Sequence, residues 1–483
     1  MIQRAIVLDR HGQVLASSLP TFSVYIHPHD IQDKQEAAII LGRLFPQLRG
    51  SKFIRDALHS KKKFVWLVRH LPPYEKNRIT AYGLHGMGII EDSQRVYPYG
   101  SLFCHVLGTT NADQQGTSGL EKGLNDVLTS PGHAEPLSTS LDVRLQEILH
   151  RQLSQTVEMF QAQGANGVLI HVHTGEVLAM VSLPDFAPDK AINPTDPSYF
   201  DRNSHGVYEF GSIMKIANTA AFLDSGKGTL ASVFDATHPL YIGRHRVTDF
   251  KGKHRPLNVL EAFIYSSNIA HAKMAVVLGA RLQKQYFTQL GFSQPVVTEL
   301  GRSARPLFPQ GDWSLPRVMT AGYGYGFAVT PLHMAKAMMA LSTGYDRPLT
   351  FLTGQKRGSQ LVYRKGTVDK MTYLMEQAVL DGQAKNAAAN NCRVGGKTGT
   401  ANIQVQGRYR QNCNLTSTAV VFPAHHPQYA LVISIDRPKG NAKTHGYVTG
   451  GWIAAPAIAR IVEEMAPLLG VLEEVPSSKP KRP

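Results

Sequence analysis

Ser212 and Lys215 are the two residues of this sequence whose types and spacing point most directly to chemistry. They lie in "SIMKIANTAAFLDSG", where apolar residues fall on every face of a predicted helix from Ser212 to Leu223 and Gly226 supplies the stop. A helix that is apolar all round belongs in the interior, so Lys215 is expected to be buried and to lose its proton. Ser212 lies three residues earlier, on the same helix face. The spacing therefore predicts a serine nucleophile beside its own neutral base.

Two further groups of polar residues follow in order along the chain. Ser266-Ser267-Asn268 lies between two segments with a helical pattern, and Lys397-Thr398-Gly399-Thr400 lies on a predicted strand. Ser-x-x-Lys alone carries little information, because the same spacing recurs at Ser60 and at Ser478. The first pair differs from these two in its apolar setting and in the two groups that follow it, and Lys-Thr-Gly occurs once in the chain.

The elements that must position these residues form an α+β pattern. A long amphipathic helix is predicted after Ser140 or Asp142 as its cap, and a hairpin follows in "ANGVLIHV" and "EVLAMVS". Far downstream, "TSTAVVFP" and "YALVISID" read as strands, and "GGWIAAPAIARIVEEMAPLL" reads as a closing helix. Strands at both ends of a region with helices between them predict one antiparallel sheet with a helical lobe. "TSTAVVFP" is expected to pair with the strand that carries Lys397.

The N-terminal part of the chain is predicted to be a separate domain. "RAIVLDRHGQVLAS" reads as a hairpin around residues 9–12, and "TSPGHAEP" is the best candidate for a boundary, near residue 135. We therefore expect an N-terminal α+β domain over residues 1–135, a second domain over 136–475 and a disordered tail over 476–483.

Composition narrows the class of protein without identifying it. The chain has 483 residues and a net charge of +15, which favours anionic surroundings, although charge for solubility is an equal alternative. No nucleic-acid motif is present, so a surface that faces an anionic cell wall is preferred to nucleic-acid binding. Three cysteines form no disulfide framework and no metal-ligand spacing. No apolar run approaches the ~18 residues that span a bilayer, and no signal peptide is recognisable.

The three polar groups together form the motif set of penicillin-binding proteins and serine β-lactamases. Other segments resemble the class B, monofunctional transpeptidases, nearest to the septal members that act in cell division. These segments are "RAIVLDRHG", "RVYPYG", "HVLGTTNADQQGTSGLEKGLN", "HVHTGEVLAMVSLPDFAP", "YGYGFAVTP" and "GGKTGTAN". The resemblance covers residue 4 to about residue 470, and it departs at Ala5, where the family usually has glycine.

The resemblance implies a peptidoglycan D,D-transpeptidase of α+β fold that cross-links stem peptides during septum synthesis. Ser212 would attack the carbonyl of a D-Ala-D-Ala peptide, and Lys215 would take its proton. Ser266 would pass that proton to the leaving amine, and Asn268 would fix Lys215 and a substrate amide. The roles require no metal ion and no cofactor.

The strand motif is implied to bind substrate. Lys397 would keep Lys215 deprotonated and attract the substrate's terminal carboxylate, which the hydroxyls of Thr398 and Thr400 would also bind. Backbone N–H groups of Ser212 and Thr400 would form the oxyanion hole. Three glycines are expected to leave room for a peptide along the strand edge: Gly395, Gly396 and Gly399.

The resemblance also implies partners and a location. β-Lactams would be covalent inhibitors, and a membrane glycosyltransferase and division proteins would dock on the N-terminal pedestal or dimerisation-type domain. Family members carry a transmembrane anchor just upstream of the first segment, so the protein is expected to work outside the cytoplasm, on the periplasmic side of the inner membrane. The acceptor stem peptide is left open.

Several alternatives stay open at this point. A hydrolase, either a D,D-carboxypeptidase or a β-lactam hydrolase, would use the same motifs, and a catalytically idle wall-binding scaffold would keep the fold alone. The intact motif set argues against the scaffold, and the N-terminal domain argues against a β-lactamase. The basic segment from Arg244 to Arg255 is interpreted as a solvated face, with substrate steering as its alternative.

Overall fold

The computed structural model describes residues 4–130, 135–190, 193, 195–242, 245–355, 357–405 and 408–473. The predicted tail over 476–483 lies outside these residues. The chain divides into two compact units, and the predicted α+β class is confirmed for both. Unit 1 contains Met1–Leu8, Val14–Pro98 and Thr109–Leu137, and unit 2 contains Asp9–Gln13, Tyr99–Gly108 and Ser138–Pro483.

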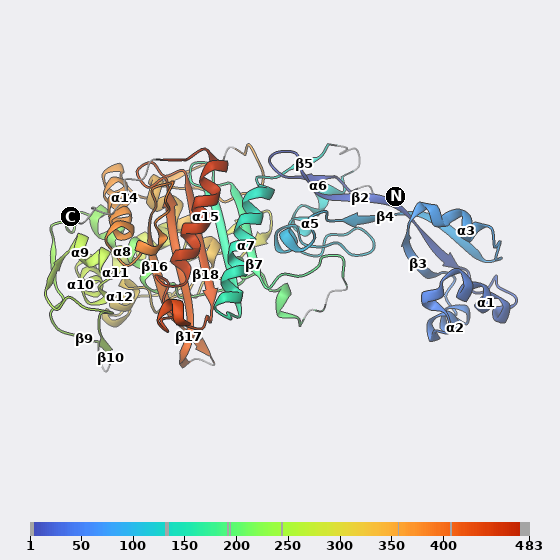
Figure 1. The fold of residues 1–483 in the computed structure, drawn as a ribbon, viewed down its shortest axis with the longest axis horizontal. Coiled ribbons are helices and arrows are strands. Elements are labelled where there is room, and N and C mark those ends of the chain that lie inside the picture. Colours follow the sequence, from blue (N-terminus) through green and yellow to red (C-terminus); the bar gives the residue numbers. More distant parts are fainter. Residues whose placement is uncertain are drawn as a thin grey trace. The chain divides into compact units, whose positions relative to one another are not determined.

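Unit 1 is built on a twisted antiparallel sheet with short helices (Figure 1). The predicted hairpin is confirmed, because Val7 pairs with Ala16 across the turn. The long strand β2 pairs with β1, β3 and β4. The strands are β1 (Val7–Leu8), β2 (Val14–Ile26), β3 (Val65–Leu71), β4 (Met87–Val96) and β5 (Leu137–Ser138). The helices are α1 (Lys34–Leu44), α2 (Lys52–Leu58), α3 (Lys76–Thr80), α5 (Gly119–Gly123) and α6 (Asn125–Leu128).

Unit 2 is organised around a five-stranded antiparallel sheet in the order β16-β17-β18-β6-β7. Its strands are β6 (Gly164–His171), β7 (Val177–Leu183), β16 (Gly395–Val405), β17 (Arg408–Phe422) and β18 (Tyr429–Asp436). The predicted hairpin, the two downstream strands and the pairing of "TSTAVVFP" with the Lys397 strand are all confirmed. β16 ends the order, so one of its edges has no partner within the sheet.

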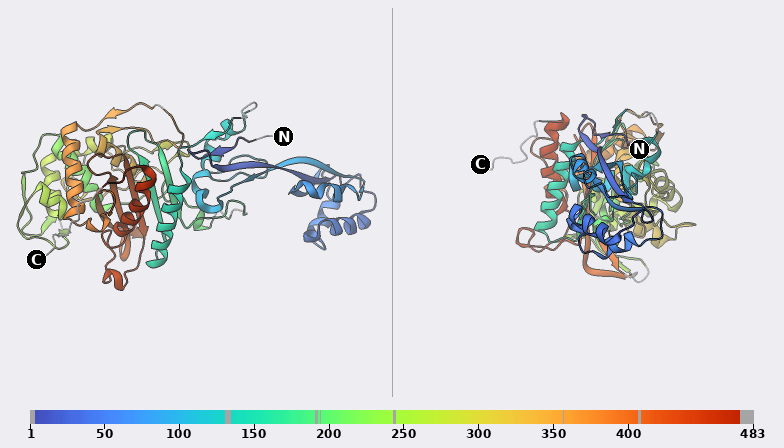
Figure 2. Two further views of the ribbon diagram at one scale, coloured as in Figure 1. Left: turned by 45° about the horizontal axis from the view of Figure 1, so that its top comes forward. Right: turned by 90° about the vertical axis from the view of Figure 1, so that its right-hand side faces the viewer.

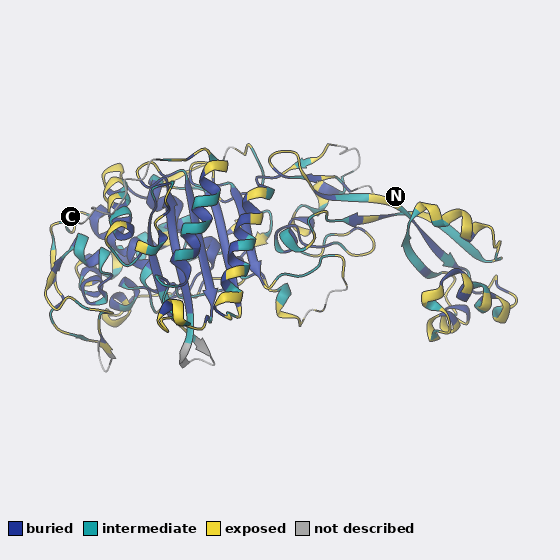
Figure 3. Ribbon diagram, in the orientation of Figure 1, coloured by how far each residue is buried: buried dark blue, intermediate teal, exposed yellow. Residues whose placement is uncertain are grey.

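Helices α7 (Val143–Met159) and α15 (Ala454–Leu469) cover one face of this sheet (Figure 1). Asp142 caps α7 by accepting from the N–H of Arg144, as predicted. Alternate residues of β18 pack with these helices, among them Leu431 and Ile433. β18 is buried on both faces, as Figure 3 shows for the whole middle of the sheet. This double burial explains why its sequence is an almost continuous apolar run.

The predicted helical lobe is present as residues 211–380, which are seen from other directions in Figure 2. Its helices are α8 (Lys215–Asp224), α9 (Val259–Ile264), α10 (Asn268–Leu278), α11 (Ala280–Gln289), α12 (Leu315–Gly322), α13 (Pro331–Thr343) and α14 (Lys365–Leu380). Four short two-stranded ribbons accompany them: β8 (Val233–Asp235) with β11 (Pro256–Asn258), β9 (Leu240–Ile242) with β10 (His245–Val247), β12 (Val297–Thr298) with β13 (Gly301–Arg302), and β14 (Tyr345–Asp346) with β15 (Gln360–Leu361). A short helix, α4 (Cys104–Leu107), also belongs to unit 2.

Among the described residues, no helix is both long enough and apolar enough to cross a membrane.

Candidate active site

Ser212 lies in a 3-10 turn, Gly211–Met214, that runs directly into α8. Every residue of α8 is buried, which confirms that this all-round apolar helix is internal. Ser212 itself is only half-buried, so its hydroxyl remains within reach of a substrate. Gly211 has φ +51°, and a Cβ added to it would lie 2.6 Å from the Thr400 carbonyl oxygen. The turn that presents Ser212 is therefore packed backbone to backbone against β16.

Lys215 is fully buried, with 0% of its surface exposed, and oxygens surround its amine. Nζ lies 2.7 Å from the Ser266 carbonyl oxygen and 2.7 Å from Asn268 Oδ1. It also lies 3.0 Å from Ser212 Oγ and 3.1 Å from Ser266 Oγ. The first two oxygens can only accept hydrogen bonds, and a neutral amine has two N–H groups and one lone pair. The lone pair is then left to accept from a serine hydroxyl.

The pKa of Lys215 is lowered well below 10.5, chiefly by burial and secondly by the charge of Lys397, whereas Asp249 acts to raise it. Lys397 is also buried, and burial lowers its pKa to about 7. The charge of Lys397 acts in the direction expected of it, toward neutral Lys215, but burial is the larger cause.

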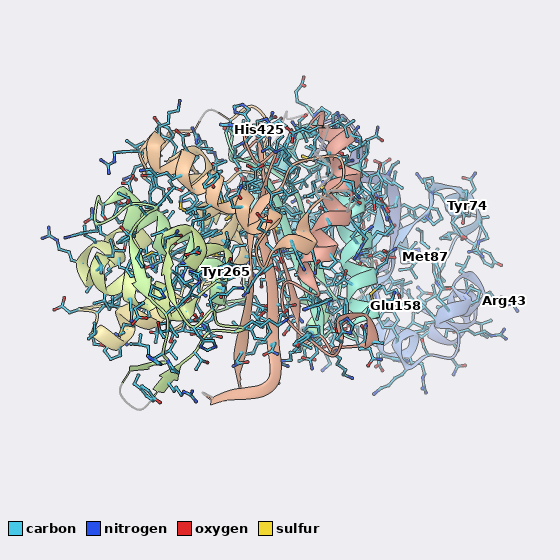
Figure 4. The ribbon with its side chains drawn as sticks, turned by 60° about the vertical axis from the view of Figure 1, so that its left-hand side comes forward. Arg43, Tyr74, Met87, Glu158, Tyr265 and His425 are labelled. Atoms are coloured by element: carbon cyan, nitrogen blue, oxygen red, sulfur yellow. The ribbon has the colours of Figure 1, made fainter. Side chains whose placement is uncertain are left out.

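The Ser-Ser-Asn turn, residues 266–268, joins α9 to α10 as predicted. Ser266 has a left-handed backbone with φ 58°, which turns both its carbonyl and its hydroxyl toward Lys215. Asn268 Nδ2 donates to the Thr248 carbonyl oxygen at 2.9 Å, which leaves Oδ1 to face Lys215. Figure 4 labels Tyr265, the residue directly before this turn, in the helical lobe.

Two residues that the sequence analysis missed hold this turn in place. Asp249 accepts from the N–H groups of Asn268 and Ile269 at 2.6 and 3.1 Å, and from Ser267 Oγ at 2.6 Å. Below the turn, buried His271 donates from Nδ1 to the Ser267 carbonyl oxygen at 2.7 Å, and its Nε2 lies 3.2 Å from Thr219 Oγ1 of α8. The one available signal was that Asp249 is the only acidic residue in an otherwise basic segment.

The strand motif lies on β16, with Lys397 opposite Ala419 and Thr400 opposite Thr416 of β17. Side chains alternate along a strand, so Thr398 and Thr400 share a face and Lys397 points to the other. Thr400 Oγ1 accepts from the Gly450 N–H at 3.0 Å, which leaves its O–H free to donate. Lys397 Nζ lies 5.8 Å from the ring centroid of Phe263 in α9.

The glycines of β16 were expected to leave room for a peptide in the space where a side chain is missing. This expectation is wrong. A Cβ on Gly395 would lie 3.2 Å from the Glu376 N atom of α14, and one on Gly396 would meet Val420 of β17. A Cβ on Gly399 would meet the Phe210 carbonyl oxygen. The protein itself fills these spaces, so the glycines allow α14, β17 and the chain just before the Gly211–Met214 turn to approach the strand.

A cavity of about 480 Å³ lies beyond Thr400 along the same strand. Its walls are mainly apolar, and Glu209 is its one acidic residue; Glu209 Oε1 accepts from the Gly326 N–H at 2.8 Å. Ala401, Asn402 and Ile403 of β16 form one side of this cavity. It has the size of a site for a small molecule or a short peptide segment.

Asp249 is expected to be a positioning residue whose charge also tunes Lys215. Asp249→Asn should move the acid limb of the acylation rate against pH to lower pH, because the carboxylate is one of the charges that raise the pKa of Lys215. The check is the second-order rate constant for acylation by a chromogenic β-lactam between pH 5 and pH 10. Asp235→Asn, at an exposed carboxylate beside Lys273, is the matched control. A limb that stays in place in Asp249→Asn would contradict the assignment.

Comparisons with known proteins add independent findings. Residues 166–463 match the family model of the penicillin binding protein transpeptidase domain, and residues 2–135 match that of the penicillin-binding protein dimerisation domain. A probable peptidoglycan D,D-transpeptidase FtsI of Caulobacter vibrioides is 36% identical over 97% of this chain and 82% of that protein. The peptidoglycan D,D-transpeptidase FtsI of Escherichia coli K12 is 29% identical over 95% of this chain and 82% of its own length.

A solved structure shows the same fold. A peptidoglycan synthetase from Bifidobacterium adolescentis superposes with a TM-score of 0.76 at 17% identity, covering 99% of this chain and 97% of its own.

Proposed function

This chain belongs to the penicillin-binding protein transpeptidase family, and from that premise we infer that it is a peptidoglycan D,D-transpeptidase that forms its acyl-enzyme on Ser212. Names of relatives support a role in cell division. The observation that carries the assignment of Ser212 is the position of the Lys215 amine. It is fully buried and within hydrogen-bond distance of two serine hydroxyls.

Acylation starts from neutral Lys215. Its two N–H groups donate to the Ser266 carbonyl and to Asn268 Oδ1, and its lone pair accepts the Ser212 O–H. Ser212 Oγ attacks the carbonyl carbon of the penultimate D-alanine, and the proton passes to Nζ. The N–H groups of Ser212 and Thr400 stabilise the oxyanion, which is supported by the close approach of Gly211 to Thr400.

Release of the terminal D-alanine needs a proton at its amine. Ser266 Oγ lies 3.1 Å from Lys215 Nζ and can relay that proton outward. The leaving residue also carries a carboxylate, which we assign to the hydroxyls of Thr398 and Thr400 and to the positive charge of Lys397, which extends from the other face of β16. A carboxylate beside Lys397 would favour its charged form and so offset the effect of burial on its pKa.

The acyl-enzyme is then transferred to an amine of a second stem peptide rather than to water. Two described carboxylates near the site are both engaged: Asp249 holds the Ser-Ser-Asn turn, and Glu209 accepts from Gly326. Each serves as a hydrogen-bond acceptor within the protein, in contrast to the additional glutamate that activates water in class A β-lactamases. This favours transfer over the hydrolytic alternatives.

A penicilloyl adduct on Ser212 is expected to persist for many minutes, which places its hydrolysis at least about three decades below the ~10 s⁻¹ of a typical enzyme. Acid-quenched samples followed by intact-mass measurement give the lifetime. A serine β-lactamase of known turnover, treated in parallel, is the control. If the adduct were lost within seconds while antibiotic was consumed repeatedly, the protein would be a hydrolase.

We further propose that residues 136–475 carry the chemistry outside the cytoplasm, on the periplasmic side of the inner membrane. Residues 1–135 would serve as a pedestal that docks a membrane glycosyltransferase and division proteins. The match of residues 2–135 to the dimerisation-domain model supports a role in protein association, not catalysis, for this domain.

A further inference from the structure

Transpeptidation requires a second substrate, and one rim of the site carries positive charge that the acylation chemistry does not use. We call Lys251 and Lys253 the basic rim. Both are exposed, and both belong to the segment that Asp249 ties to the Ser-Ser-Asn turn. Since Thr248 also accepts from Asn268 Nδ2, the rim begins within three residues of groups bonded directly to the site.

Aromatic contacts connect the basic rim to the segment around Tyr447. Phe250 meets Tyr447 edge-on, with ring centroids 6.2 Å apart, and Lys251 Nζ lies 5.8 and 5.5 Å from these two centroids. Tyr447 stacks on Trp452. The N–H of Gly450, which lies between these two residues in the sequence, donates to Thr400 Oγ1. The contact between Phe250 and Tyr447 therefore links the segment bonded to Asn268 with the segment bonded to Thr400 of β16.

The second lysine is placed in the same way. Lys253 Nζ lies 4.3 Å from the ring centroid of Tyr265, the residue that precedes Ser266 and is labelled in Figure 4. Contacts of this kind stabilise an ammonium group that lies above the face of an aromatic ring, and they do not neutralise its charge.

The charges of the basic rim are not compensated within the described part of the chain. Its neighbour Arg255 is paired with Glu261, and Lys273 lies 3.9 Å from Asp235. Among the residues that the structure describes, no carboxylate lies within ion-pair distance of Lys251 or Lys253. Two exposed positive charges that have no ion-pair partner among the described residues, on a segment bonded to the site, are suited to an anionic ligand.

We propose that the basic rim binds a carboxylate of the acceptor stem peptide and so directs its amine toward the acyl-enzyme. This inference rests on the proposed function. The donor's own terminal carboxylate is assigned to Lys397 and leaves with D-alanine, so the acceptor is the substrate that still needs an anchor. The acceptor nitrogen bonds to the acyl carbon, the bond from that carbon to Ser212 Oγ breaks, and a proton of the amine passes through Lys215 to Ser212 Oγ.

The test measures how one acyl-enzyme divides between transfer and hydrolysis. The protein is acylated with a thioester donor whose acyl group ends in D-alanine. A synthetic stem peptide with a side-chain amine is then added as the acceptor. One form of this acceptor has free carboxylates, and a second form has them amidated. We expect the double variant Lys251→Gln, Lys253→Gln to lower the ratio of transfer to hydrolysis by about 5- to 10-fold for the free acid. The ratio for the amidated peptide should stay the same.

Lys365→Gln is the matched control, because Lys365 is an exposed lysine far from the site. Its neighbour Arg364 donates its backbone N–H to Asp224, which ends α8 at the end away from Ser212. It should change neither ratio. An unchanged ratio in the double variant, or an equal fall for both peptides, would overturn the assignment of the rim. Failure of the wild-type protein to form any acyl-enzyme would instead count against the proposed function itself.

Discussion

Ser212→Ala is expected to abolish covalent labelling by a penicillin. The label forms when a serine oxygen opens the β-lactam ring, and Ser212 Oγ is the half-buried hydroxyl that lies 3.0 Å from the amine of buried Lys215. Alanine removes the attacking atom and leaves α8 and its packing unchanged. Intact-mass spectrometry after incubation with the antibiotic reads the result directly as the presence or absence of one adduct.

The matched control is Ser60→Ala. Ser60 has the same spacing to Lys63, but Lys63 is exposed, whereas Lys215 is buried at the start of an internal helix. The control should be labelled like the wild-type protein. A label that survives on the Ser212→Ala protein would show that another residue is the nucleophile.

Lys215→Arg is expected to slow acylation by about 10²–10⁴-fold, the usual contribution of a positioned base. Arginine keeps the positive charge and much of the length of lysine, but guanidinium does not lose its proton under these conditions. The measurement is the second-order rate constant with a chromogenic β-lactam. Lys336→Arg is a suitable control, because Lys336 is a half-buried lysine of α13 paired with Asp346 at 2.8 Å and has no part in the chemistry.

The pH dependence provides a second reading of the same experiment. Only neutral Lys215 can accept the proton, so the wild-type rate should rise with pH through the pKa of Lys215 and level off above it. Since burial and Lys397 lower that pKa well below 10.5, this rise should occur at lower pH than for a free lysine. The rise should be absent in Lys215→Arg. If the arginine variant acylated at the wild-type rate, Lys215 would not be the base.

The local part of the site was predictable from the sequence because its signals are local. A helix that is apolar on every face must be internal, and this placed Lys215 correctly. Two helical patterns interrupted by three polar residues predicted the turn at 266–268, and the strand patterns around Lys397 and in "TSTAVVFP" predicted the pairing of β16 with β17.

The rest depends on contacts between segments that are distant in the sequence. Asp249 reaches the start of α10 from a loop that looks like a solvated basic face, and no local pattern reports that contact. His271 has the spacing of a core residue in α10, and only the three-dimensional structure brings its ring to Thr219 of α8. The glycines of β16 were assigned to the substrate because the elements that fill their space, among them α14 and the Phe210 carbonyl, cannot be located from the sequence.

The burial of Lys215 and Lys397 also affects the stability of the fold. In the unfolded chain both amines would titrate near 10.5, whereas burial lowers the pKa of Lys397 to about 7 and that of Lys215 in the same direction. Between the lowered and the ordinary values the unfolded chain binds more protons, so the free energy of unfolding falls as the pH drops through this window. Apolar residues of similar size would fit the same positions without this penalty. The active sequence is therefore not the most stable sequence for this fold, and selection for wall synthesis holds the protein below the stability that its own architecture could reach.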